Sequence, residues 1–213
     1  MRRTVLFGVA VATMLLVSIA AIGSNMGFKI SIPLYAGGAG HTGVNMVSLP
    51  YYVNYADAAS VFADVPSCAE VDLWDEATGT YRVYDGAFNL DNFPVATGGQ
   101  LVSANAILVK VGVTENWIVV GSHNPAMTVP LYAGGSGHTG VNFRSVPYHT
   151  TATSASVMFG AIPGCAELDL WDEAAGTFRV YDGAFNLDDF PITAGQPLVI
   201  KVGATANWTP AHY

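Results

Sequence analysis

The chain has 213 residues, of which 51% are hydrophobic and only 11% are charged, and its formal net charge is −8. Such an acidic surface repels phosphate backbones, which excludes nucleic acid as a partner. The charged share lies well below the roughly 25% of a typical soluble domain, and the 23 glycines indicate many tight turns.

The first 23 residues have the pattern of an export signal. Arg2 and Arg3 precede the apolar run Val5–Ile22, and small residues at the −3 and −1 positions predict cleavage before Ser24. The alternative is a retained anchor, because about 18 apolar residues are enough to span a bilayer, and membrane contact would then be through this segment alone. Either alternative predicts an exported protein: extracellular, cell-surface or periplasmic.

An internal repeat dominates the rest of the chain. Pro33–Val95 aligns without a gap with Pro130–Ile192, at an offset of 97 residues, and about two thirds of the positions are identical. Further on the offset falls to 91, so the first repeat carries six extra residues around Gly99–Ala104. This pattern predicts two tandem domains after the leader, 24–124 and 125–213.

Each repeat begins with β signals. Phe28–Leu34 alternates in polarity and predicts a strand, with Pro33 suited to an edge position. A glycine-rich connection, Gly37–Gly43, leads to a second predicted strand, Val44–Tyr51, whose equivalent is Val141–Tyr148.

One short helix is predicted over Asn54–Asp64. Asn54 is a suitable N-cap, Val61 and Phe62 can face the core, and Pro66 ends the segment.

The clearest hairpin joins Glu70–Trp74 to Thr80–Tyr84. Asp75 can bond the turn amides, and Gly79 suits the left-handed position, as Gly176 does in the second repeat. Further strands include Ala106–Val111 and Trp117–Val120. Six or seven strands and one helix in each repeat predict an all-β chain of two small β-sandwich or open-barrel domains.

The motif order resembles a β-domain that is widespread in exported bacterial proteins of uncharacterised function. It comprises N-x-x-S-L-P-Y from Asn45, W-D-x-x-x-G-x-Y from Trp74, and Asn116-Trp117; the second repeat keeps N-x-x-S-V-P-Y from Asn142 and W-D-x-x-x-G-x-F from Trp171. The resemblance implies export and a β fold, and it implies no activity.

Gly38–Gly43 and Gly135–Gly140 match the string G-x-G-x-x-G. A dinucleotide site needs that string between a parallel strand and a helix, whereas a strand follows it here, so we expect an inter-strand loop and no nucleotide. His41 and His138 lie in these loops. They are either metal ligands or solvated loop residues, and no second histidine stands at ligand spacing.

Two acidic sets are candidates for calcium, which prefers several oxygen ligands. They do not follow the spacing of known calcium loops, so the alternative is turn capping by aspartate together with solvated hairpin charges. No other cofactor is indicated. The sets are Asp72, Asp75, Glu76 and Asp85, and Asp169, Asp172, Glu173 and Asp182.

The two cysteines, Cys68 and Cys165, occupy equivalent positions. An intramolecular disulfide needs a pseudo-two-fold arrangement with both residues near the axis. The alternatives are two buried free thiols or an intermolecular bond.

Nucleophile-elbow, H-E-x-x-H, paired C-x-x-C and haem-attachment strings are all missing from the sequence, so no enzyme is predicted. We expect a structural protein of the cell surface or extracellular space that associates with itself, in a filament or surface layer. The alternative is a secreted carbohydrate- or ligand-binding module, in which aromatic side chains stack on sugars. The tryptophans are Trp74, Trp117, Trp171 and Trp208.

Self-association has a candidate element in the first strand, because little chain precedes it in the mature protein. It can either pair within its own domain or add to an edge strand of another copy. The apolar residues that would be donated are Phe28, Ile30, Ile32 and Leu34.

Overall fold

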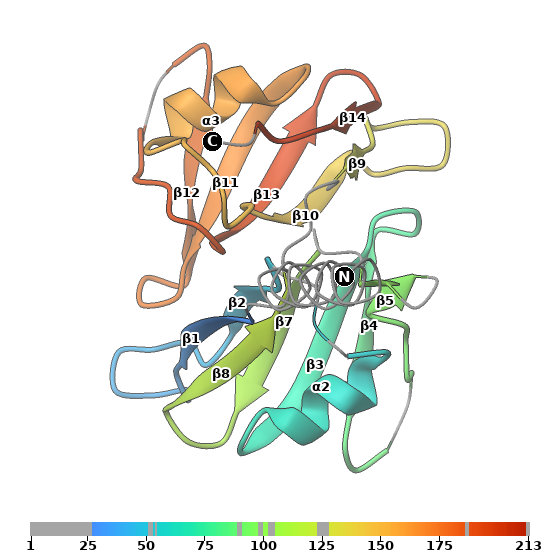
Figure 1. Cartoon of the computed structure of the whole chain (residues 1–213), viewed down its shortest axis with the longest axis vertical. Helices are drawn as coiled ribbons and strands as arrows, with labels where there is room; N and C mark the ends of the chain where they lie inside the picture. Colours follow the sequence, from blue (N-terminus) through green and yellow to red (C-terminus); the bar gives the residue numbers. More distant parts are fainter. Residues whose placement is uncertain are drawn as a thin grey trace, which may run out of the picture.

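A computed structural model shows a mostly antiparallel β protein built from two similar repeats (Figure 1). The predicted leader, 1–23, and the predicted helix cap Asn54 lie outside the described residues. In the part of the chain that is described, no helix has the length and apolar character needed to cross a membrane. The described residues are 27–50, 53, 55–88, 91–97, 100–101, 105–122, 128–185 and 188–211.

Repeat 1 contains a four-stranded antiparallel sheet in the order β2-β7-β3-β4 and a two-stranded sheet of β1 and β8. A small antiparallel pair, β5–β6, precedes and enters the inserted segment. The bounds are β1 Phe28–Leu34, β2 Asn45–Ser48, β3 Cys68–Asp75, β4 Thr80–Asp85, β5 Ala96–Thr97, β6 Gln100–Leu101, β7 Ala106–Val111 and β8 Glu115–Gly121.

Repeat 2 has the equivalent four-stranded sheet, β10-β13-β11-β12, and a shorter two-stranded sheet of β9 and β14. The predicted all-β fold with one short helix in each repeat is therefore confirmed. The bounds are β9 Val129–Leu131, β10 Val141–Ser145, β11 Cys165–Asp172, β12 Thr177–Asp182, β13 Pro197–Val202 and β14 Ala206–Trp208.

The helix of repeat 1, α2, is Ala58–Asp64, so the predicted start at Asn54 is wrong. Asp57 is the N-cap: its carboxylate accepts from the Ser60 N–H, and the Ser60 hydroxyl closes a capping box with the Asp57 backbone. A capping box satisfies two N-terminal backbone groups, which explains the later start. The equivalent helix, α3 (Ala155–Ala161), is capped by Ser154.

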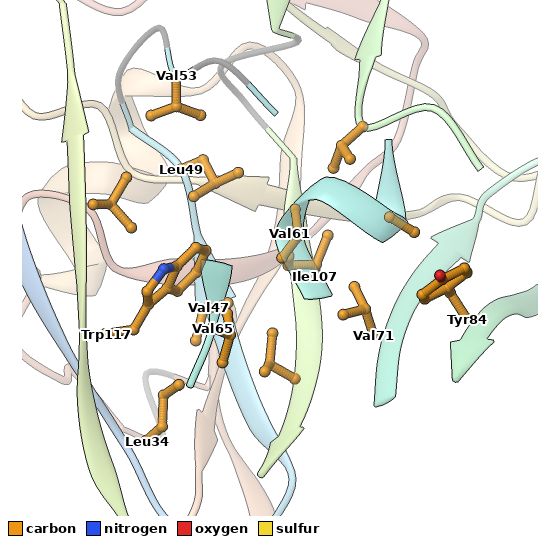
Figure 2. Packing of buried hydrophobic residues seen from close by; sticks show 14 of the residues in the cluster. Leu34, Val47, Leu49, Val53, Val61, Val65, Val71, Tyr84, Ile107 and Trp117 are labelled. Atoms are coloured by element: carbon orange, nitrogen blue, oxygen red, sulfur yellow. The ribbon is translucent and has the colours of Figure 1, made fainter. Parts of the chain in front are cut away.

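The core of each repeat lies between its two sheets and its helix. In repeat 1, Val61 of α2 lies beside Ile107 of β7, and the same buried cluster includes Leu34 of β1 and Trp117 of β8, all nearly inaccessible to solvent (Figure 2). Repeat 2 builds its separate core from equivalent positions, including Trp208 of β14.

A pseudo-two-fold rotation relates the repeats. Figure 1 shows α2 and α3 at the two outer ends of the molecule, while β2 and β10 lie toward the middle. The equivalent residues Ser48 and Ser145 meet there, with 2.9 Å between their hydroxyl oxygens. A translation of one repeat onto the other would keep equivalent residues apart, so this contact indicates a rotation.

Candidate functional site

The glycine-rich loop before β2 is a tight turn, closed by two backbone hydrogen bonds of 3.0 Å between Gly38 and His41. Gly43 has a φ of +77°, and a Cβ there would fall 2.6 Å from the nitrogen of Gly37. Only glycine fits such a position. Asn45 holds the loop base by accepting from the Tyr35 N–H (2.8 Å) and donating to the Tyr35 carbonyl (3.0 Å). The prediction of an inter-strand loop is confirmed.

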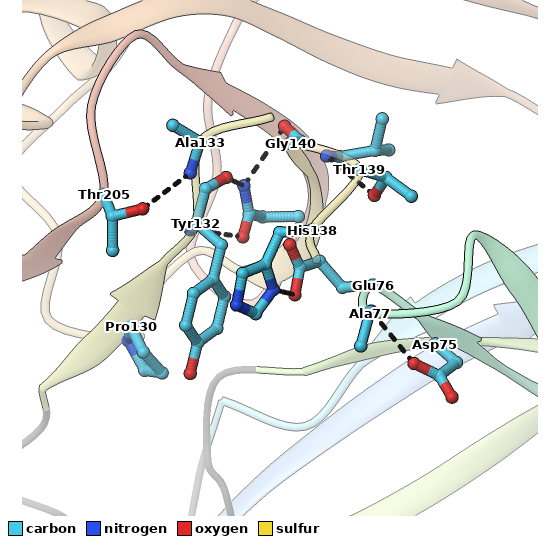
Figure 3. Close-up of polar contacts among 12 residues, drawn as sticks. Asp75, Glu76, Ala77, Pro130, Tyr132, Ala133, His138, Thr139, Gly140 and Thr205 are labelled. Carbon is cyan, nitrogen blue, oxygen red and sulfur yellow. Dashed lines mark hydrogen bonds and ion pairs between the residues drawn. The ribbon is translucent and has the colours of Figure 1, made fainter. Parts of the chain in front are cut away.

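The glycine-rich loop of each repeat contacts the hairpin turn of the other repeat. The His41 ring stacks on Tyr35, with centroids 4.1 Å apart, and its Nδ1 pairs with the Glu173 carboxylate. The reciprocal contact stacks His138 on Tyr132 at 4.2 Å and pairs its Nδ1 with Glu76 at 2.6 Å (Figure 3). We call these two reciprocal contacts the clasp. The interpretation of both histidines as solvated loop residues is wrong, because the fold brings a glutamate from the other repeat to each ring.

Backbone contacts reinforce the clasp. The Thr139 N–H donates to the Glu76 carbonyl at 3.0 Å, and the Thr42 N–H donates to the Glu173 carbonyl at 3.4 Å. The hairpin turns that carry these glutamates are the predicted ones, since Asp75 Oδ1 accepts from two turn amides. Gly79 and Gly176, at φ +70° and +66°, occupy left-handed positions as predicted.

Two tryptophans cross the interface next to the clasp. The Trp74 indole N–H donates to the Val141 carbonyl at 2.9 Å, and the Trp171 indole N–H donates to the Val44 carbonyl at 2.8 Å. Trp117 and Trp208 are buried in the cores of their repeats. All four indoles therefore have packing roles, and none forms an exposed platform for sugar stacking.

A cavity of about 130 Å³ lies between the two four-stranded sheets, on the Trp171 side of the pseudo-axis. Tyr81 and Phe178, 43% and 40% exposed, stand at its rim. We call it the aromatic slot, and its lining residues are Val44, Met46, Tyr81, Leu108, Phe143, Trp171 and Phe178.

Asp72 and Asp169 are buried in β3 and β11. Asp72 Oδ2 lies 3.7 Å from Lys110 Nζ, and Asp169 Oδ2 lies 3.4 Å from Lys201 Nζ. Within the described structure the other oxygen of each carboxyl, Oδ1, has no hydrogen-bond partner. Burial first, and then the glutamate two residues earlier, raise the pKa of each carboxyl to about 6.

The acidic sets do not converge on one point. Asp75 and Asp172 cap the hairpin turns, while Asp85 and Asp182 each accept from the N–H three residues on at 2.6 Å. Glu76 and Glu173 belong to the clasp, as described above. Across the described ranges, no three His, Cys, Asp or Glu side chains are grouped as they would be around a metal ion.

Cys68 and Cys165 are free, half-buried thiols. Of the alternatives left open by the sequence, the structure has two free thiols and no intramolecular disulfide, even though the repeats are related by rotation. Each cysteine begins its strand, six residues or roughly 20 Å before the tryptophan that crosses the interface, so both lie far from the axis. Burial raises the thiol pKa of Cys68 to about 11 and that of Cys165 to about 12.

Comparison with protein-family models, with curated proteins and with solved structures gave no match. The resemblance to β-domains of exported bacterial proteins stays a prediction. Sequence reasoning singled out the clasp histidines and glutamates as metal candidates and missed their mutual pairing. The available signal was their place in the most similar stretches of the two repeats, a loop and a hairpin turn.

Proposed function

We propose that the chain is an exported structural protein of the cell surface or extracellular space, which associates end to end through the equivalent outer ends of its repeats. One observation carries the proposal: Phe88 and Phe185 occupy equivalent positions, and each is 75% exposed. Export is supported by the leader pattern of residues 1–23.

Both phenylalanines follow fixed turns. The Phe88 N–H donates to Asp85 Oδ1 and the Phe185 N–H donates to Asp182 Oδ1, each at 2.6 Å. Gly86 packs directly on α2, since a Cβ there would fall 2.5 Å from the Phe62 ring. Each exposed ring is thus presented by an ordered turn beside a helix.

The two turns that carry these phenylalanines lie toward opposite ends of the molecule. The hairpin tip before β4 touches repeat 2, so β4 runs away from the interface toward α2, and β12 runs toward α3 in the same manner. Figure 1 places these helices at opposite ends. A contact made by one end can be repeated at the other, and a molecule with two such ends builds open chains with further copies.

Sedimentation velocity and electron microscopy of the chain from Ser24 onward test the proposal. The unsubstituted chain should form linear polymers as its concentration rises. Phe88→Ser or Phe185→Ser alone should stop assembly at dimers, because one end remains, and the double variant should be monomeric. Val120→Thr, which changes an exposed apolar residue on β8, is the matched control and should polymerise normally.

Exchange of β1 between copies is the other route to polymers. In the structure, β1 pairs along its whole length with β8 of its own chain, from Phe28 opposite Gly121 to Leu34 opposite Glu115. Polymers that persist in the double phenylalanine variant but disappear when Ser24–Ile32 is deleted would favour strand donation. A strictly monomeric unsubstituted chain would contradict both routes.

A further inference from the structure

The aromatic slot lies where the two halves of the interface differ. On the Trp74 side, the Phe143 ring stacks on the indole, with centroids 5.7 Å apart and planes 18° from parallel. Tyr81 meets the same phenyl ring edge-on at 6.1 Å. On the Trp171 side, the residue equivalent to Phe143 is Met46, which has no ring to place against Trp171 or Phe178.

We propose that the slot binds one small, neutral aromatic molecule. Its ring takes the place beside Trp171 that the phenyl ring of Phe143 takes beside Trp74. The proposal is independent of end-to-end association, because the slot lies at the interface between the repeats and the proposed contacts lie at the outer ends.

Size limits the ligand to about one six-membered ring. The slot measures about 130 Å³, and an apolar protein cavity of about 150 Å³ is large enough to hold benzene. An aromatic ring also gains from offset or edge-to-face contact with Trp171 and Phe178, which already meet edge-on with centroids 5.0 Å apart.

Charge limits the ligand to a neutral one. None of the seven lining residues is charged, and the Trp171 indole N–H is already donated to the Val44 carbonyl. A charged group in the slot would lose hydration without a compensating partner. The Tyr81 hydroxyl is the remaining side-chain polar group, so a ligand can carry a hydroxyl toward the rim.

Benzyl alcohol is the probe, and the methionine methyl groups are the reporters. In the chain from Ser24 onward, labelled on the methionine methyls and on the indole nitrogens, titration should shift the Met46 methyl and the Trp171 indole N–H saturably, with one molecule bound per chain. Met158, buried in the core of repeat 2, should not shift. Cyclohexylmethanol, of similar size but without a π-system, should bind roughly three- to tenfold more weakly.

Two variants of one residue sharpen the test. Met46→Phe should weaken binding by about tenfold or more, because its phenyl ring fills the slot as Phe143 fills the other side. Met46→Leu keeps the slot open and should bind benzyl alcohol with nearly unchanged affinity. The proposal is overturned if the Met46 methyl of the unsubstituted chain shows no saturable shift, if Met158 shifts equally, or if cyclohexylmethanol binds as well as benzyl alcohol.

Discussion

The two repeats share their turns and differ where they meet. The glycine loops, hairpin tips and clasp residues are equivalent in both, but the positions of Met46 and Val47 in repeat 1 hold Phe143 and Arg144 in repeat 2. The two-stranded sheet also differs, with seven paired residues in β1–β8 and three in β9–β14. The contacts of the clasp are therefore symmetric, whereas the residues between the two four-stranded sheets differ between the repeats. The aromatic slot results from this difference.

Arg144 is the most unusual residue of that centre. It is buried, its Nε and Nη2 donate to the Pro130 carbonyl at 3.1 and 2.9 Å, and its Nη1 donates to Asn105 of repeat 1 at 3.2 Å. Burial lowers its guanidinium pKa to about 10. The arginine thus bonds the backbone of the short strand β9 and at the same time ties the two repeats together.

The largest expected change in the free energy of unfolding comes from glycine variants that test whether the two glycine-rich loops are equivalent. Gly43→Ala and Gly140→Ala should each lower the free energy of unfolding by about 3 kcal/mol, since both combine left-handed backbone with a Cβ 2.6 Å from a backbone nitrogen. Urea unfolding measures the change. Gly38→Ala is the control: its φ is +97° and its Cβ would meet nothing within 4 Å, so strain alone should cost about 1 kcal/mol. Unequal losses at Gly43 and Gly140 would contradict the equivalence.

A smaller loss of stability is expected from substitution of Arg144, a position at which the two repeats differ. Arg144→Lys should reduce stability by about 1–2 kcal/mol, because one ammonium group cannot reproduce the paired bonds to Pro130 and the bond to Asn105. Arg82→Lys, at a partly exposed ion pair with Asp91, should lower the free energy of unfolding by less than about 1 kcal/mol. If chemical denaturation gave equal losses of stability for Arg144→Lys and Arg82→Lys, burial of Arg144 would be unimportant.

Stability should fall as pH rises from about 4 to about 6, by an amount on the order of 1–2 kcal/mol for each of Asp72 and Asp169. Their pKa values are raised to about 6 in the folded chain, which therefore binds more protons than the unfolded chain in this window. Asp72→Asn with Asp169→Asn should flatten the curve there and raise stability at pH 7. Urea midpoints measured across the window check this, and an unchanged slope in the double variant would refute it.

The smallest expected effect is on the reactivity of the two cysteine thiols. Because the pKa values of both thiols are raised, alkylation of the native chain at neutral pH should be slow at Cys68 and Cys165 alike. Mass spectrometry of the unreduced, unfolded chain should find two alkylatable thiols. A mass without any alkylation would indicate that Cys68 and Cys165 are joined in a disulfide.

Local features of the fold were predictable from the sequence, and contacts between the repeats were not. The hairpin turn follows from Asp75 and Gly79, since each residue acts on its own backbone. The helix start was missed because Asn54 and Asp57 are both able to cap, and the Ser60 hydroxyl favours Asp57. The clasp joins residues 132 and 62 positions apart. A repeat alignment establishes that such residues are equivalent but does not give the rotation that brings them together.

A pseudo-two-fold interface pairs the repeats, and a nuclear Overhauser experiment on the indole N–H protons can observe this interface in solution. We expect cross-peaks from Trp74 to Val141 and from Trp171 to Val44, whose carbonyls accept those protons. The Trp117 indole, which donates to Asp64 within repeat 1 at 2.8 Å, is the internal control. Cross-peaks within repeat 1 from Trp117, without cross-peaks from Trp74 or Trp171 to the other repeat, would show that the repeats do not pair through this interface.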